Sequence, residues 1–425
     1  MRFAIIALGS RGDVQPHIAL GAGLKDAGHD VCLVTHALFE SSIRRLGLGF
    51  SPIEINPREL VENEMGQAWL GSGNNLLFFF QRFSRLAEPL ILQVMNDCWQ
   101  ACESVDAIVT SPLGICVAAS VAQKLGVPCW VGAGQPLTPT NYFAIPFFPD
   151  APSWLPIGRS SYNYLTYMLS MRIFWQLIRP SVNKARQKIL NLPPLYSNWL
   201  YEQVLHQRFP MLYYFSPSVL PQPPDWSNKN HVTGYWFLHD DQDWQPPTAL
   251  LEFLRSGPAP VYVGFGSMRS PKSGEMTNIV LQALARTSQR GILVTGWGGI
   301  SDVNLPEDVY MIDFVPHSWL FPQMAAVVHH GGAGTMAASI RAGVPTIMIP
   351  FFGDQPFWGR RYFALGITPK PIPHKHLTVE RLVQAIQIAI NDEDIRTRLA
   401  LLNKHMNTEN GVSRAIEILE KCSWP

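Results

Sequence analysis

Residues 327–361 read VVHHGGAGTMAASIRAGVPTIMIPFFGDQPFWGRR, and this stretch decides the fold. An apolar segment ends in HHGGAGT, a helix-like segment runs to about Ala342, and a second apolar segment, VPTIMIPF, follows. Strand, glycine-containing loop, helix and strand in this order predict a parallel α/β sheet. The small residues let several backbone N–H groups approach a ligand at the positive end of a helix, and a phosphate is the natural guest.

The same alternation extends outward in both directions. PVYVGFGS, RGILVTGWGG and VYMIDFVP precede the stretch, and an amphipathic helix near 378–391 follows it. The N-terminal part repeats the pattern in RFAIIAL, GSRGDVQPH, IALGAGLKDAGHD and VCLVTH. We therefore predict an α/β protein with two Rossmann-like domains that face each other across a cleft.

The domain limits follow from shifts in composition. The first domain is expected over 1–220, a linker rich in Pro, Asn, Asp and Trp over 221–247, and the second domain over 248–400. A C-terminal helix within 401–425 is expected to return to the first domain. An aromatic-rich insertion broken by prolines is expected over 141–209. Within it, SYNYLTYMLSMRIFWQLIRP (161–180) is expected to be helical up to Pro180, because proline usually ends a helix.

Composition excludes several classes of protein. The chain has 425 residues, of which 47% are apolar and 15% charged, so it can bury two large cores. A formal charge of +1 gives no electrostatic case for nucleic acid. The six cysteines lack paired-ligand spacing, no secretory leader is evident and no apolar run approaches the roughly 20 residues of a membrane span, which favours a cytoplasmic location.

Three groups of side chains suggest chemistry, each beside a plainer interpretation. His330 can donate to a diphosphate oxygen, although a strand-end histidine is often structural. Asp354 and Gln355 follow a strand on the same rim and offer acceptors and donors to sugar hydroxyls, or they form a simple turn before Pro356. Asp13 either caps a helix or serves as a general base that takes the proton of a hydroxyl.

These residues belong to motifs that resemble one family. GSRGDVQP, VTGYW, VGFGSM, FVPHSWLF and HHGGAGTMAASIRAGVPTIMIPFFGDQPFWG are similar to the sterol 3-β-glucosyltransferase branch of the family-1 GT-B glycosyltransferases. They are also similar to the bacterial glycosyltransferases that decorate glycopeptide and macrolide antibiotics. The resemblance covers both domains in the same order and is least specific at 50–105 and 140–215.

The resemblance implies a role for each matching position. Asp13 matches the base that activates the acceptor, and Ser10 and Gly12 shape its loop. The positions that would bind the donor are Ser267 at the phosphates, Phe314 and Val315 at the nucleobase, His330, Gly332, Gly334 and Thr335 in the diphosphate loop, and Asp354 with Gln355 at the sugar. Plant members carry a ribose-binding Glu where this chain has Ala338, which leaves UDP and TDP both open.

The expected reaction transfers a hexose, preferentially glucose, from a nucleotide sugar such as UDP-glucose to a hydroxyl of an apolar acceptor such as a sterol. The transfer is expected to invert the anomeric centre. No metal and no cofactor beyond the donor is expected. Aromatic stretches at 69–83 and 162–176, the second flanked by arginines, suggest an acceptor groove or peripheral contact with the inner membrane surface.

A sugar-nucleotide epimerase and a non-catalytic nucleotide- or lipid-binding protein are the alternatives. A nicotinamide-dependent oxidoreductase is disfavoured because GSRGDVQP lacks the GxGxxG fingerprint.

Overall fold

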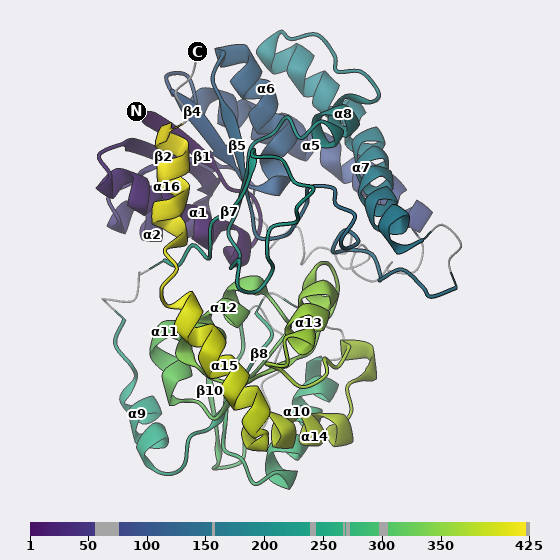
Figure 1. Ribbon diagram of the computed structural model, residues 1–425. Helices are drawn as coiled ribbons and strands as arrows, with labels where there is room; N and C mark the ends of the chain where they lie inside the picture. The colour runs from purple at the N-terminus through teal and green to yellow at the C-terminus, as the bar shows by residue number, and fades with distance from the viewer. Residues whose placement is uncertain are drawn as a thin grey trace. The chain divides into compact units, whose positions relative to one another are not determined.

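A computed structural model describes residues 1–55, 76–154, 158–238, 244–266, 268, 273–296 and 305–421, without the side chains of 76–87, 205 and 273. The chain forms two compact units (Figure 1). Unit 1 comprises Met1–Tyr214, Gln222–Leu238 and Asn410–Pro425, and unit 2 comprises Phe215–Pro221 and His239–Glu409. The predicted pair of Rossmann-like domains is confirmed by a parallel sheet in each unit.

The sheet of unit 1 has the strand order β3-β2-β1-β4-β5-β6-β7, and all its pairings are parallel. Apolar runs form these strands because helices cover both faces. The strands are β1 (Arg2–Ile6), β2 (Asp30–His36), β3 (Gly49–Ile53), β4 (Ala107–Thr110), β5 (Cys129–Ala133), β6 (Met211–Tyr213) and β7 (Asn230–Val232).

Two helical layers enclose this sheet. One core contains residues of α1 and α16, and the other contains residues of α5, α6 and α7. The helices of unit 1 are α1 (Arg11–Asp26), η1 (Ala37–Phe39), α2 (Glu40–Arg45), α5 (Leu76–Ala101), η2 (Pro112–Gly114), α6 (Ile115–Leu125), α7 (Arg159–Leu190), α8 (Trp199–Leu205) and α16 (Gly411–Lys421).

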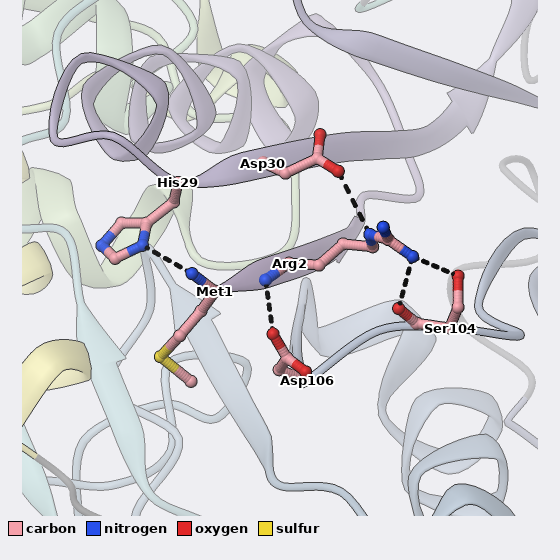
Figure 2. A network of polar contacts seen from close by, with 6 residues as sticks. All are labelled: Met1, Arg2, His29, Asp30, Ser104 and Asp106. Atoms are coloured by element: carbon pink, nitrogen blue, oxygen red, sulfur yellow. Dashed lines mark hydrogen bonds and ion pairs between the residues drawn. The ribbon is translucent and has the colours of Figure 1, made fainter.

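A polar network joins the amino ends of three strands of unit 1 (Figure 2). The Arg2 guanidinium forms an ion pair with Asp30 at 3.1 Å and donates to Ser104, while the Arg2 backbone N–H donates to Asp106 at 2.7 Å. The Arg2–Asp30 pair is exposed and contributes little stability. The network fixes the register of β1, β2 and the start of β4 at the amino ends of the strands. Ligands bind α/β sheets at the opposite edge, which the carboxyl ends form.

The sheet of unit 2 has the strand order β10-β9-β8-β11-β12, again entirely parallel. Its strands are β8 (Val261–Gly264), β9 (Gly291–Val294), β10 (Val309–Ile312), β11 (Ala326–His329) and β12 (Thr346–Met348). Its helices are α9 (Thr248–Arg255), α10 (Ser273–Arg286), α11 (His317–Leu320), η3 (Phe321–Gln323), α12 (Ala333–Ala342), α13 (Gln355–Ala364), η4 (His374–His376), α14 (Val379–Asn391) and α15 (Glu393–Met406).

Helix α7 does not end at Pro180, as the sequence predicted, but continues to Leu190. Proline removes one helical hydrogen bond and crowds the preceding turn. Buried residues on both sides of Pro180, such as Trp175 before and Val182 after, keep the helix packed against the other helices of unit 1. Tertiary packing outweighs the local preference here.

The expected linker at 221–247 also differs from the structure. Residues 222–238 belong to unit 1, because Asn230–Val232 pairs with β6 as strand β7. At the other end of the chain, α15 belongs to unit 2, whereas α16 packs against α1 in unit 1. A Cβ atom on Gly23 of α1 would lie 2.4 Å from Val412 of α16, so the two helices approach closely.

Candidate active site

Both sheets have a point where the strand order reverses. It lies between β1 and β4 in unit 1 and between β8 and β11 in unit 2. At such a point the connections after neighbouring strands run to opposite faces, which leaves a crevice for a ligand at the carboxyl ends. Asp13 follows β1 and His330 follows β11, so two of the predicted site residues lie at these points.

Asp13 is held by the loop that precedes it. Ser10 is the N-cap residue of α1, and Asp13 Oδ2 accepts hydrogen bonds from the Ser10 N–H at 2.9 Å and from Ser10 Oγ at 3.0 Å. Gly9 has a φ of +124°, and a Cβ atom there would lie 2.5 Å from Asp13 Oδ2. Only glycine therefore allows this close approach. Gly12, the other predicted loop residue, lies exposed in the first turn of α1.

Burial raises the pKa of Asp13 above its usual value of 3.8, although the two hydrogen bonds from Ser10 act in the opposite direction. A carboxylate with a raised pKa is a better proton acceptor near neutral pH. Both hydrogen bonds reach Oδ2, and no described residue donates to Oδ1. Oδ1 is therefore the oxygen that can receive a proton.

His17 supports the same turn, and sequence reasoning missed it. Its ring is fully buried, its Nδ1 donates to the Asp13 carbonyl at 2.8 Å, and its edges meet the rings of Tyr214 and Trp236. Burial lowers the pKa of His17 to about 4, so the imidazole is neutral at physiological pH. The sequence could have indicated it, because His17 ends GDVQPH, one helical turn after Asp13.

His330 lies between glycines of two neighbouring strand ends in unit 2. A Cβ atom on Gly332 would lie 2.6 Å from His330 Nε2, and one on Gly266 would lie 3.1 Å from His330 Cε1. Burial lowers the pKa of His330 to about 4, so the ring is neutral and offers one N–H donor.

The first turn of α12 follows directly, with Gly332 as its N-cap residue. Gly334 is exposed with open space around it, and Thr335 is half-buried. The first N–H groups of a helix lack partners within the helix. This turn and the His330 imidazole together form a cradle suited to an anion.

Asp354 and Gln355 lie at the start of α13. Asp354 Oδ2 accepts from the Trp358 indole at 3.0 Å. Gln355 is buried, and its side-chain oxygen accepts from the backbone N–H groups of Phe351 at 2.8 Å and Phe352 at 3.4 Å. The Gln355 carboxamide oxygen therefore braces its own loop in this structure, and the half-buried Asp354 is the more accessible of the two.

The remaining predicted positions differ in accessibility. Phe314 follows β10 and is 44% exposed, whereas the side chain of Val315 is buried in the core of unit 2. Only the backbone of Val315 is thus available to a ligand. Ser267 lies outside the described residues. Ala338 is half-buried in α12.

Within the described part of the chain, no group of three or more His, Cys, Asp or Glu side chains is arranged to hold a metal ion. A separate search of the same residues finds no helix with the length and hydrophobicity needed to cross a bilayer.

Two parallel Rossmann-like sheets, one with a carboxylate and the other with an anion cradle at the point of reversal, are typical of glycosyltransferases of the GT-B class. Family models agree with this class in both units. Residues 3–113 match the glycosyltransferase family 28 N-terminal domain, and residues 279–422 match the erythromycin biosynthesis protein CIII-like C-terminal domain.

The chain belongs to the family of the sterol 3-beta-glucosyltransferases. It is 36% identical to such an enzyme from Arabidopsis thaliana over 99% of this chain and 68% of that protein. It is 35% identical to one from Emericella nidulans over 99% of this chain but only 30% of that protein. The chain thus spans about two thirds of the plant relative and less than a third of the fungal one. The resemblance seen in the sequence is confirmed, while the assignment to family 1 stays a prediction.

Solved structures confirm the fold. The glycotransferase of kitacinnamycin matches with a TM-score of 0.69 at 18% identity, over 99% of this chain and 98% of that one. The glycosyltransferase VinC, solved in complex with DTDP, matches with a TM-score of 0.67 at 17% identity, over 99% of both chains.

Proposed function

We propose that this chain transfers glucose from a nucleotide sugar, preferentially UDP-glucose, to the hydroxyl of a sterol, with inversion at the anomeric carbon. Family membership supports the transfer of a hexose, and the names of the plant and fungal relatives favour a sterol acceptor. The observation that carries the mechanism is the Asp13 carboxylate, which Ser10 fixes while burial raises its pKa.

Asp13 serves as the general base in this proposal. The acceptor O–H gives its proton to Asp13 Oδ1 as the acceptor oxygen attacks the anomeric carbon of the donor. A new C–O bond forms on one face of the sugar while the bond to the diphosphate oxygen breaks on the other, and the electron pair leaves with the diphosphate. A single displacement of this kind inverts the anomeric centre.

Unit 2 binds the donor in this proposal. The neutral His330 donates one hydrogen bond to the departing diphosphate, and the first turn of α12, through Gly334 and Thr335, offsets its negative charge. The exposed ring of Phe314 stacks on the nucleobase. Asp354 contacts sugar hydroxyls, and Gln355 keeps the loop of Asp354 in place.

Unit 1 provides an apolar surface for the acceptor. Two hydrogen bonds tie the loop at 141–145 to α7, from Asn163 Nδ2 to the Asn141 carbonyl and from the Ile145 N–H to Thr166 Oγ1, each 3.0 Å long. Large apolar side chains are exposed on all three parts of this region. Tyr142 lies on the loop, Phe147 and Trp154 follow it, and Leu165 and Leu169 lie on α7.

The exposed arginines Arg159 and Arg172 lie on the same helix. An apolar surface next to basic residues suits an interfacial contact with anionic lipid, from which a sterol would be drawn. We therefore propose that the protein works in the cytoplasm at the inner membrane surface. The aromatic stretch at 69–83 lies outside the described side chains.

A transfer assay tests the function. Purified protein would receive UDP-glucose or TDP-glucose with a sterol, a polyketide or no acceptor, and released nucleotide and glycoside would be measured together. We expect a β-linked sterol glucoside from an α-linked donor, preferentially with UDP-glucose. Saturable nucleotide binding without transfer to any acceptor would overturn the proposal and favour a non-catalytic binding protein.

A further inference from the structure

The loops that follow β1 and β11 each contain a glycine in the left-handed region. Gly9 has a φ of +124° and Gly331 a φ of +97°. A Cβ atom on Gly331 would lie 2.8 Å from Met348 Cε, just as one on Gly9 would meet Asp13. Glycine tolerates these angles but also has the greatest conformational freedom, so another contact must hold each loop.

In unit 1 that contact comes from His36, the last residue of β2. The Gly9 N–H donates to His36 Nε2 at 3.2 Å, while His36 Nδ1 donates to the Ile55 carbonyl at 2.7 Å. A carbonyl can only accept, so the proton of the ring is on Nδ1 and Nε2 carries the lone pair. Burial lowers the pKa of His36, which favours this neutral form.

In unit 2 the equivalent contact comes from His329, the last residue of β11. The Gly331 N–H donates to His329 Nδ1 at 2.9 Å, and the ring is fully buried. Burial is the main cause that lowers the pKa of His329 well below its usual value, and the neighbouring His330 contributes. As at His36, a ring nitrogen accepts a glycine N–H, but here it is Nδ1, and the buried Nε2 of His329 has no hydrogen-bond partner among the described residues.

We infer that His36 and His329 are positioning residues that fix, through one accepted glycine N–H each, the loop of the base and the loop of the diphosphate. The inference rests on the proposed function of these loops. Neither imidazole touches a reacting atom; each acts through the backbone that places Asp13 or His330.

The use of opposite nitrogens allows a crossed substitution test. Glutamine places its oxygen near the position of Nε2, whereas asparagine places its oxygen near Nδ1. His36→Gln should therefore keep the accepted hydrogen bond and His36→Asn should lose it. The order is reversed at the second site, where His329→Asn should keep the bond and His329→Gln should lose it.

The two sites should also affect different kinetic constants. Displacement of a catalytic group by about 1 Å can cost on the order of 100-fold in rate. We expect His36→Asn to lower kcat about 10- to 100-fold with the KM for UDP-glucose nearly unchanged. His329→Gln should weaken UDP binding, measured by calorimetry, about 10-fold or more, and His329→Asn about 3-fold at most.

Exposed histidines provide matched controls, His206→Gln in unit 1 and His405→Gln in unit 2, which should behave as the unchanged protein. Equal losses from Gln and Asn at either site, or no loss from either, would overturn the inference for that site.

Amide hydrogen exchange on the unsubstituted protein tests the inference without any variant. The Gly9 and Gly331 amides should be protected, and rapid exchange of either amide would overturn the inference for its loop. If no glucose is transferred at all, the proposed function fails, while calorimetry and exchange still test the two histidines.

Discussion

Replacement of Asp13 by asparagine separates the role of the carboxylate in catalysis from its role in capping α1. Asparagine has nearly the same shape and can still accept from the Ser10 N–H and hydroxyl, so the loop should keep its conformation. It cannot take a proton from an acceptor hydroxyl. A general base typically contributes about 100- to 10,000-fold to the rate, and we expect kcat to fall by that amount.

The effect on stability should have the opposite sign. The pKa of Asp13 is raised in the folded protein, so the folded state binds this proton more tightly than the unfolded chain does. That stabilising preference is present below the ordinary pKa of 3.8 and is lost as the pH rises through the folded value. At neutral pH the ionised carboxylate therefore costs stability, and Asp13→Asn should leave Tm unchanged or raise it.

The measurement combines transfer of glucose to a sterol, calorimetric binding of UDP-glucose and thermal unfolding. Donor binding should stay within about 2-fold, because the proposed donor contacts are all made by residues of unit 2 and Asp13 acts on the acceptor hydroxyl. Retention of more than about a tenth of the transfer rate would refute the assignment of Asp13 as the base. A large fall in Tm would show that its main role is structural.

Four other predictions concern the diphosphate loop and α16. His330→Ala should weaken UDP-glucose binding about 10- to 150-fold, the value of one hydrogen bond to a charged group, as measured by calorimetry. In the unchanged protein the affinity should be nearly constant from about pH 6 to 8, because a ring whose pKa is lowered to about 4 stays neutral there, and a change of more than about 3-fold would contradict this. Gly332→Ala should lower Tm, because its Cβ would lie 2.6 Å from His330 Nε2. Gly334→Ala has open space and should raise Tm slightly, since alanine favours a helix more than glycine does. Equal shifts of Tm would argue against the close approach of Gly332 to His330. Gly411→Ala should destabilise unit 1 by about 1 to 3 kcal/mol in chemical unfolding, because its Cβ would lie 2.2 Å from the Gly234 carbonyl oxygen, and an unchanged midpoint would count against the docking of α16.

Much of the fold could be predicted because most strands are apolar runs that end in glycine-containing loops. The helix that starts at Ala333 and ends at Ala342 follows from the sequence between two such runs. The positions of Asp13 and His330 could be predicted for the same reason, since each follows a strand at the point of reversal. Strands β6 and β7 were missed, because each is short and lies beside or within a proline-rich segment that predicted an insertion or a linker.

The supporting contacts were beyond sequence reasoning. His36 is visible as the last residue of VCLVTH and His329 as the first histidine of AAVVHH. Their partners are backbone N–H groups, which leave no trace in the sequence. Gln355 illustrates the same limit: its residue type fits a sugar contact, whereas the structure engages its oxygen with Phe351 and Phe352.

The return of α16 to unit 1 has a consequence for the order in which the protein can fold during synthesis. Residues 239–409 of unit 2 form one uninterrupted insertion, whereas unit 1 receives its last helix only after unit 2 has been made. Until then, the surface of α1 around Gly23 lacks the side chains of Val412 and Ile416 that cover it. Of the two units, the one that begins first at the ribosome is thus completed last, with its apolar α1 surface left for chaperones to shield in the interval.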